Sequence, residues 1–236
     1  MPMVRANSSE ILFIVDRSGS MESIKRDMVG GFATLLNELR TVSGECGVTI
    51  VQFNIDYAVT FRGSLWEPIP FEIHPSGGTA LLDAMGRAIE ETGARLASMP
   101  ASTRPDRVLV VVITDGEENS SRVYSRARVF EMVRHQRERY AWEFMFLGAN
   151  QDAITEAAKI GIRNSVDFTA DMNGVDAAVK TSGKSAARYR QSGHAFNSEE
   201  MQANYRAELS NPTEPTPGAP INIVVNVPTI PGAKKP

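Results

Sequence analysis

Three stretches of the chain are apolar almost without interruption and are short enough to be strands. They are Ile11–Val15, Arg107–Thr114 and Trp142–Leu147. A short apolar run without polar alternation is typical of a strand buried on both faces of a parallel sheet. The pattern therefore predicts three central strands, of which residues 107–114 form the strongest.

Helical patterns fill the segments between these runs. After Met21, apolar residues recur at spacings of three and four up to Leu39, which predicts an amphipathic helix that Ser43 and Gly44 end. Further helices are predicted over residues 81–96, 124–139, 152–160 and 175–190. Each of them follows a predicted strand or a loop that leaves one.

The remaining strands are predicted at the edges of the sheet. Gly47–Phe53 is β-branched, and the short link Asn54–Asp56 connects it to Tyr57–Phe61 as an antiparallel hairpin. A second edge strand is expected at Ser165–Phe168. Strands alternating with helices predict an α/β fold: a doubly wound, mostly parallel sheet with helices on both faces and one antiparallel edge strand.

The chain divides into three predicted parts. Residues 1–9 form a polar N-terminal extension, residues 10–195 the α/β domain and residues 196–236 a Pro-rich C-terminal tail. Seven of the 13 prolines lie in the last 25 residues, which indicates an extended linker or a disordered segment. Within the tail, residues 221–227 have high strand propensity and could dock on a sheet edge, in the same or a neighbouring molecule.

Composition narrows the function classes. The 236 residues carry a formal net charge of -3, which argues against a non-specific nucleic-acid binder because such a protein needs a basic face. The single cysteine, Cys46, excludes an intrachain disulfide and fits a reducing compartment. No apolar run approaches the roughly 18 residues of a membrane span, and Met1–Ser9 lacks the apolar core of a secretory signal. A cytoplasmic protein without membrane contact is therefore expected.

Polar side chains with oxygen donors follow the predicted strands. Asp16, Ser18 and Ser20 follow the first strand, Thr79 follows a glycine pair at the start of a helix, and Asp115 ends the strongest strand. The carboxyl ends of parallel strands share one edge of the sheet, where α/β proteins hold ligands. Two carboxylates and three hydroxyls are hard donors that suit Mg²⁺, Mn²⁺ or Ca²⁺ and disfavour zinc or copper. With few charged donors, an acidic group from a partner would complete the site.

Other interpretations of these residues remain open at this point. Ser18, Ser20 and Thr79 could each be a helix cap, although three such turns together favour the metal site. Asn119 and Asn150 could line the rim of the site or be turn residues, and the second interpretation is slightly preferred; Glu117 and Glu118 are expected to form a solvated acidic rim. Gly183-Lys184-Ser185 is not a phosphate-binding loop because no strand precedes it. His74, His135 and His194 do not lie at strand ends, which argues against a hydrolase with a histidine base.

The spaced oxygen donors resemble a known family. Asp16-Arg17-Ser18-Gly19-Ser20, Thr79 in Ser-Gly-Gly-Thr-Ala-Leu, and Asp115-Gly116 are similar in order and spacing to the metal-ion-dependent adhesion site of von Willebrand factor type A domains, especially stand-alone bacterial and phage members. The resemblance covers roughly residues 10–190. It implies a Rossmann-like fold with the metal at the top of the sheet. It further implies that Ser18, Ser20 and Thr79 ligate directly, and Asp16 and Asp115 partly through water.

The expected function is a metal-dependent protein-binding module and not an enzyme. Its cation, Mg²⁺ or else Mn²⁺ or Ca²⁺, would accept an Asp or Glu side chain of a partner protein. Relatives in the resembling family often work beside AAA+ ATPases, which the resemblance permits here. The alternative is a structural or assembly subunit, of a phage or polymer, that self-associates through its C-terminal tail. A metal-dependent phosphohydrolase is the least favoured interpretation because no acid/base pair is evident.

Overall fold

The computed structural model describes residues 8–149, 153–195 and 197–210. Within these residues six strands form one sheet in the order β3-β2-β1-β4-β5-β6. Neighbouring strands pair in parallel except β2 and β3, which are antiparallel. The strands are β1 (Ser9–Asp16), β2 (Cys46–Phe53), β3 (Tyr57–Ser64), β4 (Arg107–Thr114), β5 (Glu143–Gly148) and β6 (Asn164–Asp167). The predicted fold class, with its one antiparallel edge strand, is confirmed.

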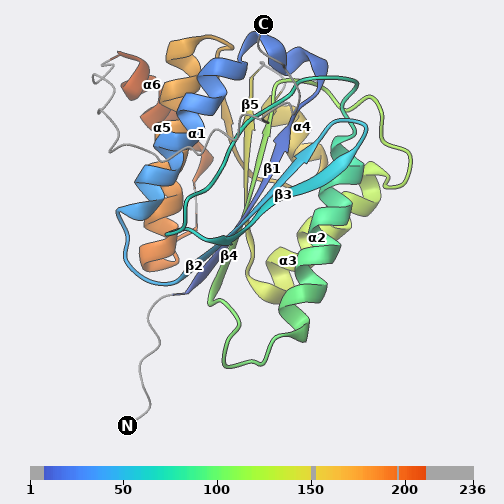
Figure 1. Ribbon diagram of the computed structural model, residues 1–236, viewed down its shortest axis with the longest axis vertical. Helices are drawn as coiled ribbons and strands as arrows, with labels where there is room; N and C mark the ends of the chain where they lie inside the picture. Colours follow the sequence, from blue (N-terminus) through green and yellow to red (C-terminus); the bar gives the residue numbers. More distant parts are fainter. Residues whose placement is uncertain (1–7, 150–152, 196, 211–236) are drawn as a thin grey trace, which may run out of the picture.

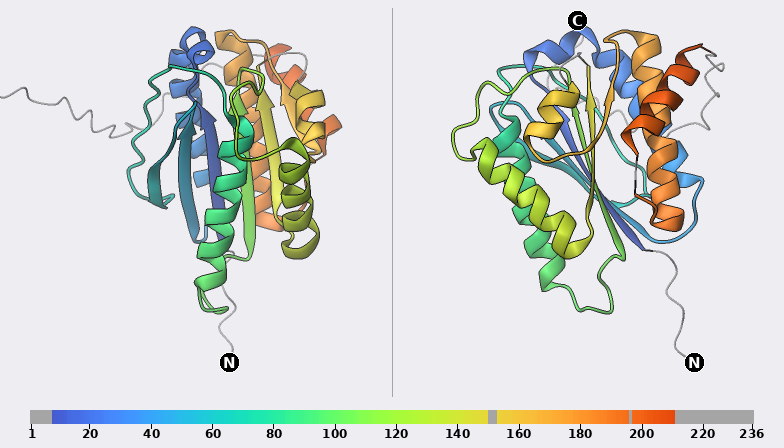
Figure 2. Two further views of the ribbon diagram at one scale, coloured as in Figure 1. Left: turned by 90° about the vertical axis from the view of Figure 1, so that its right-hand side faces the viewer. Right: turned by 180° about the vertical axis from the view of Figure 1, so that it is seen from behind.

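Helices cover both faces of this sheet (Figures 1 and 2). Helices α1 and α5 lie on one face, and α2 and α3 lie on the other. The helices are the short 3₁₀ turn η1 (Gly19–Ser23), α1 (Lys25–Arg40), α2 (Leu81–Ser98), α3 (Arg126–Tyr140), α4 (Ala153–Lys159), α5 (Met172–Ser192) and α6 (Ser198–Ser210). All five predicted helices occur, with ends that differ by a few residues, and α6 is an additional one.

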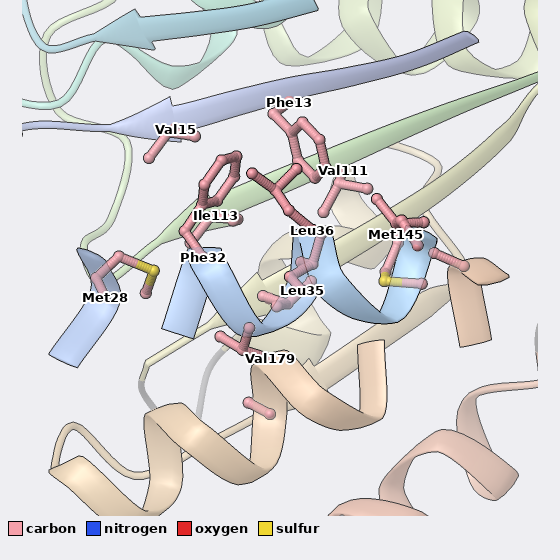
Figure 3. Packing of buried hydrophobic residues seen from close by; sticks show 14 of the residues in the cluster. Phe13, Val15, Met28, Phe32, Leu35, Leu36, Val111, Ile113, Met145 and Val179 are labelled. Carbon is pink, nitrogen blue, oxygen red and sulfur yellow. The ribbon is translucent and has the colours of Figure 1, made fainter. Parts of the chain in front are cut away.

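The central strands are buried on both faces, as their unbroken apolar sequences predict. In β1, Phe13 and Val15 belong to the cluster under α1 and α5, whereas Leu12 and Ile14 belong to the cluster under α2 and α3. Figure 3 shows Phe32 of α1 directed toward the sheet beside Phe13. The Phe32 ring contacts Phe13 edge-on at 4.9 Å between ring centroids. This rigid core fixes the ends of β1 and β4, from which the candidate site is built.

Residues that the sequence assigns to the N-terminal extension and to the C-terminal tail take part in the fold within the described part of the chain. Ser9 is the first residue of β1, and the backbone N–H of Ser8 donates to Asp106, so both residues belong to the fold. Helix α6 lies in the segment predicted as tail, yet its Met201 and Tyr205 are buried in the core. Sequence periodicity missed α6 because only these two side chains of the helix are buried. The predicted docking strand at residues 221–227 lies outside the described residues.

Helix α6 covers the edge of β6 through polar side chains. The Gln202 amide accepts from the Asp167 backbone N–H and donates to the Asp167 carbonyl, both at 3.2 Å, as a neighbouring strand would. The Ser165 N–H donates to Ser198 Oγ at 3.3 Å, and the Thr169 N–H to the Tyr205 hydroxyl at 3.0 Å. An edge strand closed in this way has fewer backbone groups available for pairing with another molecule.

We expect Gln202→Ala to lower the free energy of unfolding by about 1–2 kcal/mol, because two hydrogen bonds to the β6 edge are lost. Urea unfolding measures this change. Arg206→Ala, at an exposed position of the same helix, is the matched control and should stay within about 0.5 kcal/mol of the wild type. Equal effects of the two substitutions would contradict the edge-covering role of Gln202.

No helix in the described ranges is both long enough and apolar enough to span a membrane.

Candidate metal centre

Asp16 forms the buried base of the site at the carboxyl end of β1. Its side chain is completely buried, and each carboxylate oxygen accepts one hydrogen bond from the protein. Oδ1 accepts from the Ser18 backbone N–H at 2.7 Å, and Oδ2 accepts from the Thr114 hydroxyl at 2.6 Å. Thr114 is the last residue of β4, the strand next to β1. The Asp16 carboxylate is therefore fixed in place by groups from two adjacent strand ends.

The two serines connect this base to the end of β4. The Oγ atoms of Ser18 and Ser20 are 3.1 Å apart, and Ser20 Oγ donates to Asp115 Oδ1 at 2.7 Å. Ser18 is buried, whereas Ser20 lies exposed in η1. Hydroxyl and carboxylate oxygens that are 95 residues apart in sequence thus lie side by side.

Thr79 joins the group through Gly116. A Cβ atom added to Gly116 would lie 3.4 Å from both Ser20 Oγ and Thr79 Oγ1, so both hydroxyls lie beside the same face of this glycine. The structure therefore brings Asp16, Ser18, Ser20, Thr79 and Asp115 together at the carboxyl edge of the sheet, as the sequence predicts. These five residues, together with Gly116, are called the cradle from here on.

Backbone contacts hold the Thr79 segment against the β1 loop. Gly77 has a positive φ of 71°, which glycine adopts without strain, and its carbonyl accepts from the Gly19 N–H at 3.0 Å. The Thr79 N–H donates to Asn119 Oδ1 at 2.9 Å, and the Asn119 N–H donates to the Thr79 carbonyl at 3.0 Å. Asn119 therefore positions Thr79, so of its two predicted interpretations the one beside the site, and not a turn residue alone, agrees with the structure.

Glu118 also differs from its expected role as part of a solvated rim. Its carboxylate accepts from the backbone N–H groups of Leu82, Ser120 and Ser121 at 2.7–2.9 Å. Leu82 lies in the first turn of α2, where N–H groups lack partners within the helix. Glu118 thus caps α2 and fixes the loop after Asp115, whereas Glu117 is exposed as predicted.

We expect Gly78→Ala to weaken divalent-cation binding about ten- to a hundred-fold without changing any oxygen donor of the cradle. The added Cβ would clash with Ser120 Oγ and lie 2.9 Å from Asn119 Oδ1, which share a hydrogen bond, so both side chains must shift and with them the amide that positions Thr79. Losses of this size are typical when groups that orient metal ligands are disturbed. Calorimetric titration with Mg²⁺ measures the change.

Gly30→Ala is the control for this substitution. Nothing lies within 4 Å of a Cβ at Gly30, and the residue is in the interior of α1. This variant should gain up to about 1 kcal/mol in stability and keep the wild-type cation affinity. If Gly78→Ala also keeps that affinity, Asn119 does not position Thr79 for binding.

Burial affects the pKa values of both carboxyl groups of the site, Asp16 and Asp115. Burial raises the pKa of Asp16 above its usual value of 3.8, and the hydrogen bonds from Thr114 and Ser18 counteract this only in part, while the Asp115 charge raises it further. Burial also raises the pKa of Asp115, against the hydrogen bond from Ser20. Within the described ranges, no Lys or Arg forms an ion pair with Asp16. A bound cation would relieve this uncompensated negative charge.

The donor set fits a hard divalent cation. All five side chains offer oxygen, and none offers the sulfur or imidazole nitrogen that zinc and copper prefer. No three His, Cys, Asp or Glu side chains of the described segments gather into a group that could hold a metal ion. Binding here would therefore rely on hydroxyl oxygens for most of its protein ligands.

The other chemical candidates are the Gly-Lys-Ser sequence, the histidines and a cavity. Gly183, Lys184 and Ser185 lie inside α5, so they do not form a phosphate-binding loop. His74 follows β3 on an exposed loop, and His135 lies in α3. A cavity of about 540 Å³ lies between α3 and α4, and none of the five cradle residues lines it.

Solved structures share this arrangement of strands and helices. A von Willebrand factor type A protein from Catenulispora acidiphila matches with a TM-score of 0.53 and 14% identity over 77% of this chain and 43% of that one. The ArnB paralog VWA2 from Sulfolobus acidocaldarius matches with a TM-score of 0.52 and 13% identity, over 75% of this chain and 46% of that one. The pilus adhesin SpaC from Lactobacillus rhamnosus GG matches with a TM-score of 0.55 and 13% identity, over 80% of this chain and 31% of that one.

This chain spans less than half the length of each of these three proteins. No protein-family model matches the sequence, and no curated protein matches it either. The sheet order, the helices on both faces and these structural matches lead to the conclusion that the chain has the fold of a von Willebrand factor type A domain.

Proposed function

We propose that the cradle at the carboxyl edge of the sheet binds a divalent cation, Mg²⁺ in the first place, and through it a carboxylate of a partner protein. The observation that carries this proposal is the convergence of hydroxyls from Ser18, Ser20 and Thr79 with the Asp115 carboxylate. Ser20 Oγ lies 2.7 Å from Asp115 Oδ1 and 3.1 Å from Ser18 Oγ. These four side chains would hold the cation.

Asp16 has a different part in this proposal. Both of its oxygens accept hydrogen bonds from the protein, so its charge acts from behind the hydroxyls and orients Ser18 through the backbone. Asp115 is then the one carboxylate among the direct ligands. A divalent cation held mainly by neutral hydroxyls keeps affinity for a further anionic oxygen, and a partner Asp or Glu supplies it.

The residues around the cradle favour a binding function over catalysis. A hydrolase of this geometry would need a general base beside a hydroxyl; His135 lies in α3, His194 follows α5, and the exposed His74 contacts Glu72. We therefore propose a protein-binding module and not an enzyme. SpaC, one of the proteins that share the fold, is named a pilus adhesin, and adhesion is a role of the same kind.

An array of immobilised peptides tests this function. Two sets of peptides carry the same collection of varied flanking sequences. The central residue is Asp in one set and Asn in the other. We expect the wild-type protein to bind the Asp set at least ten-fold more strongly in Mg²⁺, and to lose this preference in excess chelator. Ser20→Ala should lose it as well, while Gly30→Ala should keep it.

Equal binding to the Asp and Asn sets in Mg²⁺ would contradict carboxylate recognition. An Asp preference that persists in chelator would contradict the role of the cation.

A further inference from the structure

An exposed isoleucine is held in a fixed position beside the cradle. Ile55 lies in the turn between β2 and β3, and 64% of its surface is exposed. Single exposed apolar residues are common on protein surfaces, so exposure by itself indicates little. What distinguishes Ile55 is the rigid turn that carries it and the segment that it contacts.

The preceding residue, Asn54, fixes this turn. Asn54 is 3% exposed, and its side-chain Nδ2 donates to the Ser76 carbonyl at 2.8 Å. Its Oδ1 accepts from the Asp56 N–H at 2.8 Å, and its carbonyl accepts from the Ala80 N–H at 2.9 Å. Asn54 therefore ties the β2–β3 turn to both ends of the segment that contains Thr79.

Ile55 itself lies against this segment. Its Cγ1 is 3.6 Å from the position that a Cβ would take on Gly77, whose carbonyl accepts from Gly19 in the β1 loop. The aliphatic side chain thus borders the point where the loops that carry Ser20 and Thr79 meet. Ile55 is thus an exposed apolar neighbour of the loops that carry the cradle residues.

We propose that Ile55 is a specificity contact: the partner segment that presents its carboxylate to the cradle carries an aliphatic side chain, such as Leu, within two residues of that acid, and this side chain packs on Ile55. The inference rests on the proposed function. A single carboxylate contact would accept any exposed acid, whereas specific recognition needs a second contact that many acidic segments lack. The hydrogen-bonded turn holds the Ile55 backbone in place, and a β-branched side chain has few rotamers, so little entropy is lost on binding.

The same peptide array, restricted to peptides with central Asp, tests this inference. Leu or Ser is placed at each of the two positions on either side of the acid, and binding is measured in Mg²⁺. We expect wild-type protein to favour Leu about ten-fold at one or more positions, the size expected for burying a large part of one aliphatic side chain. Ile55→Ser should reduce the preference to less than three-fold, and Ile55→Val should retain most of it.

Two controls separate Ile55 from the rest of the surface and from the cation. Tyr140→Ser removes a side chain that is 60% exposed at the end of α3. This position is close to the start of β5, at the edge of the sheet opposite the carboxyl edge, so the variant should keep the Leu preference. The rise in melting temperature on adding Mg²⁺ should be unchanged in Ile55→Ser, because this variant keeps all oxygen donors.

The outcomes distinguish this inference from the function on which it rests. If Asp is preferred over Asn in Mg²⁺ but Leu and Ser bind equally, or if Ile55→Ser keeps the Leu preference, the specificity contact is wrong and the proposed function stands. If Asp and Asn bind equally, the proposed function fails, and the inference fails with it.

Discussion

Replacing Ser20 and Asp115 together with alanine should abolish the rise in melting temperature that Mg²⁺ produces in the wild-type protein. The two side chains share a 2.7 Å hydrogen bond and supply two of the four proposed direct ligands. A ligand at a hundred times its dissociation constant stabilises the folded state by about 2.7 kcal/mol. For a domain of this size, that corresponds to a shift of roughly 5–10 °C, which differential scanning calorimetry measures.

A matched double variant controls for the loss of one hydroxyl and one acid from the same loops. Ser23→Ala with Glu117→Ala removes an exposed serine of η1, whose hydroxyl donates to the Ser20 backbone carbonyl and not to a proposed ligand atom, and the exposed acid two residues after Asp115. This control should keep the full response to Mg²⁺. Without divalent cations, both double variants should melt close to the wild type, since Ser20 and Asp115 are at the rim of the sheet. A wild-type protein that shows no shift in 10 mM Mg²⁺, or a control that loses the shift, would contradict the proposed site.

Asp16→Asn should have opposite effects with and without a divalent cation. In chelator the variant should melt at the same temperature as the wild type or higher, because a completely buried carboxylate without an ion pair in the described residues is replaced by a neutral group of the same shape. In Mg²⁺ it should bind the cation about ten- to a hundred-fold more weakly, since the charge behind the hydroxyls is lost.

The pH dependence of stability in chelator follows from the raised pKa of Asp16. Below its ordinary pKa of 3.8 the carboxyl is neutral in the folded and unfolded states, so its ionisation costs nothing. As the pH rises from 3.8 through the higher pKa of the folded state, the unfolded state ionises first, and the wild-type protein loses stability relative to Asp16→Asn. The difference in melting temperature should therefore grow over this range and then remain constant.

Thermal denaturation of the wild type and Asp16→Asn from pH 4 to 8, with and without Mg²⁺, measures these differences in melting temperature. Glu117→Gln is the control, because Glu117 is exposed and its neutralisation should change little. The account is contradicted if Asp16→Asn is less stable than the wild type in chelator at pH 7 and unchanged in its affinity for Mg²⁺. That result would make Asp16 a purely structural residue.

The sequence predicted the sheet and the location of the site for the same physical reason. Strands β1 and β4 are buried on both faces, and such strands need unbroken apolar sequences. Asp16 and Asp115 are the acids at which those sequences stop, and parallel neighbours end at one edge. The convergence of the five oxygen donors could therefore be expected before any coordinates were known.

The groups that orient these donors could not be predicted in the same way. Asn119 and Glu118 act through hydrogen bonds between a side chain and the backbone of a segment about 40 residues away, and such bonds leave no periodic pattern in the sequence. Thr114 could have been identified from the sequence as a group near the site, because it is a polar residue at the end of an otherwise apolar strand. Its hydroxyl donates to Asp16, and strand burial explains why it can reach no bulk water.

The sequence did not predict helix α6, for a different reason. It is attached through Met201 and Tyr205, through polar side chains that cover β6 and through surface ion pairs such as that of Arg188 with Glu200. Amphipathic periodicity detects helices that bury a continuous apolar stripe. A helix that covers a strand edge with Ser198 and Gln202 does not show that pattern.

The most direct test of the account is to locate a divalent cation in crystals of the protein soaked in Mn²⁺, by its anomalous scattering. The account predicts one strong peak at the carboxyl edge of the sheet, within coordination distance of the hydroxyls of Ser20 and Thr79, and no such peak in Ser20→Ala with Asp115→Ala. A saturating soak that leaves this position without a peak, or that places the cation away from these hydroxyls, would contradict it.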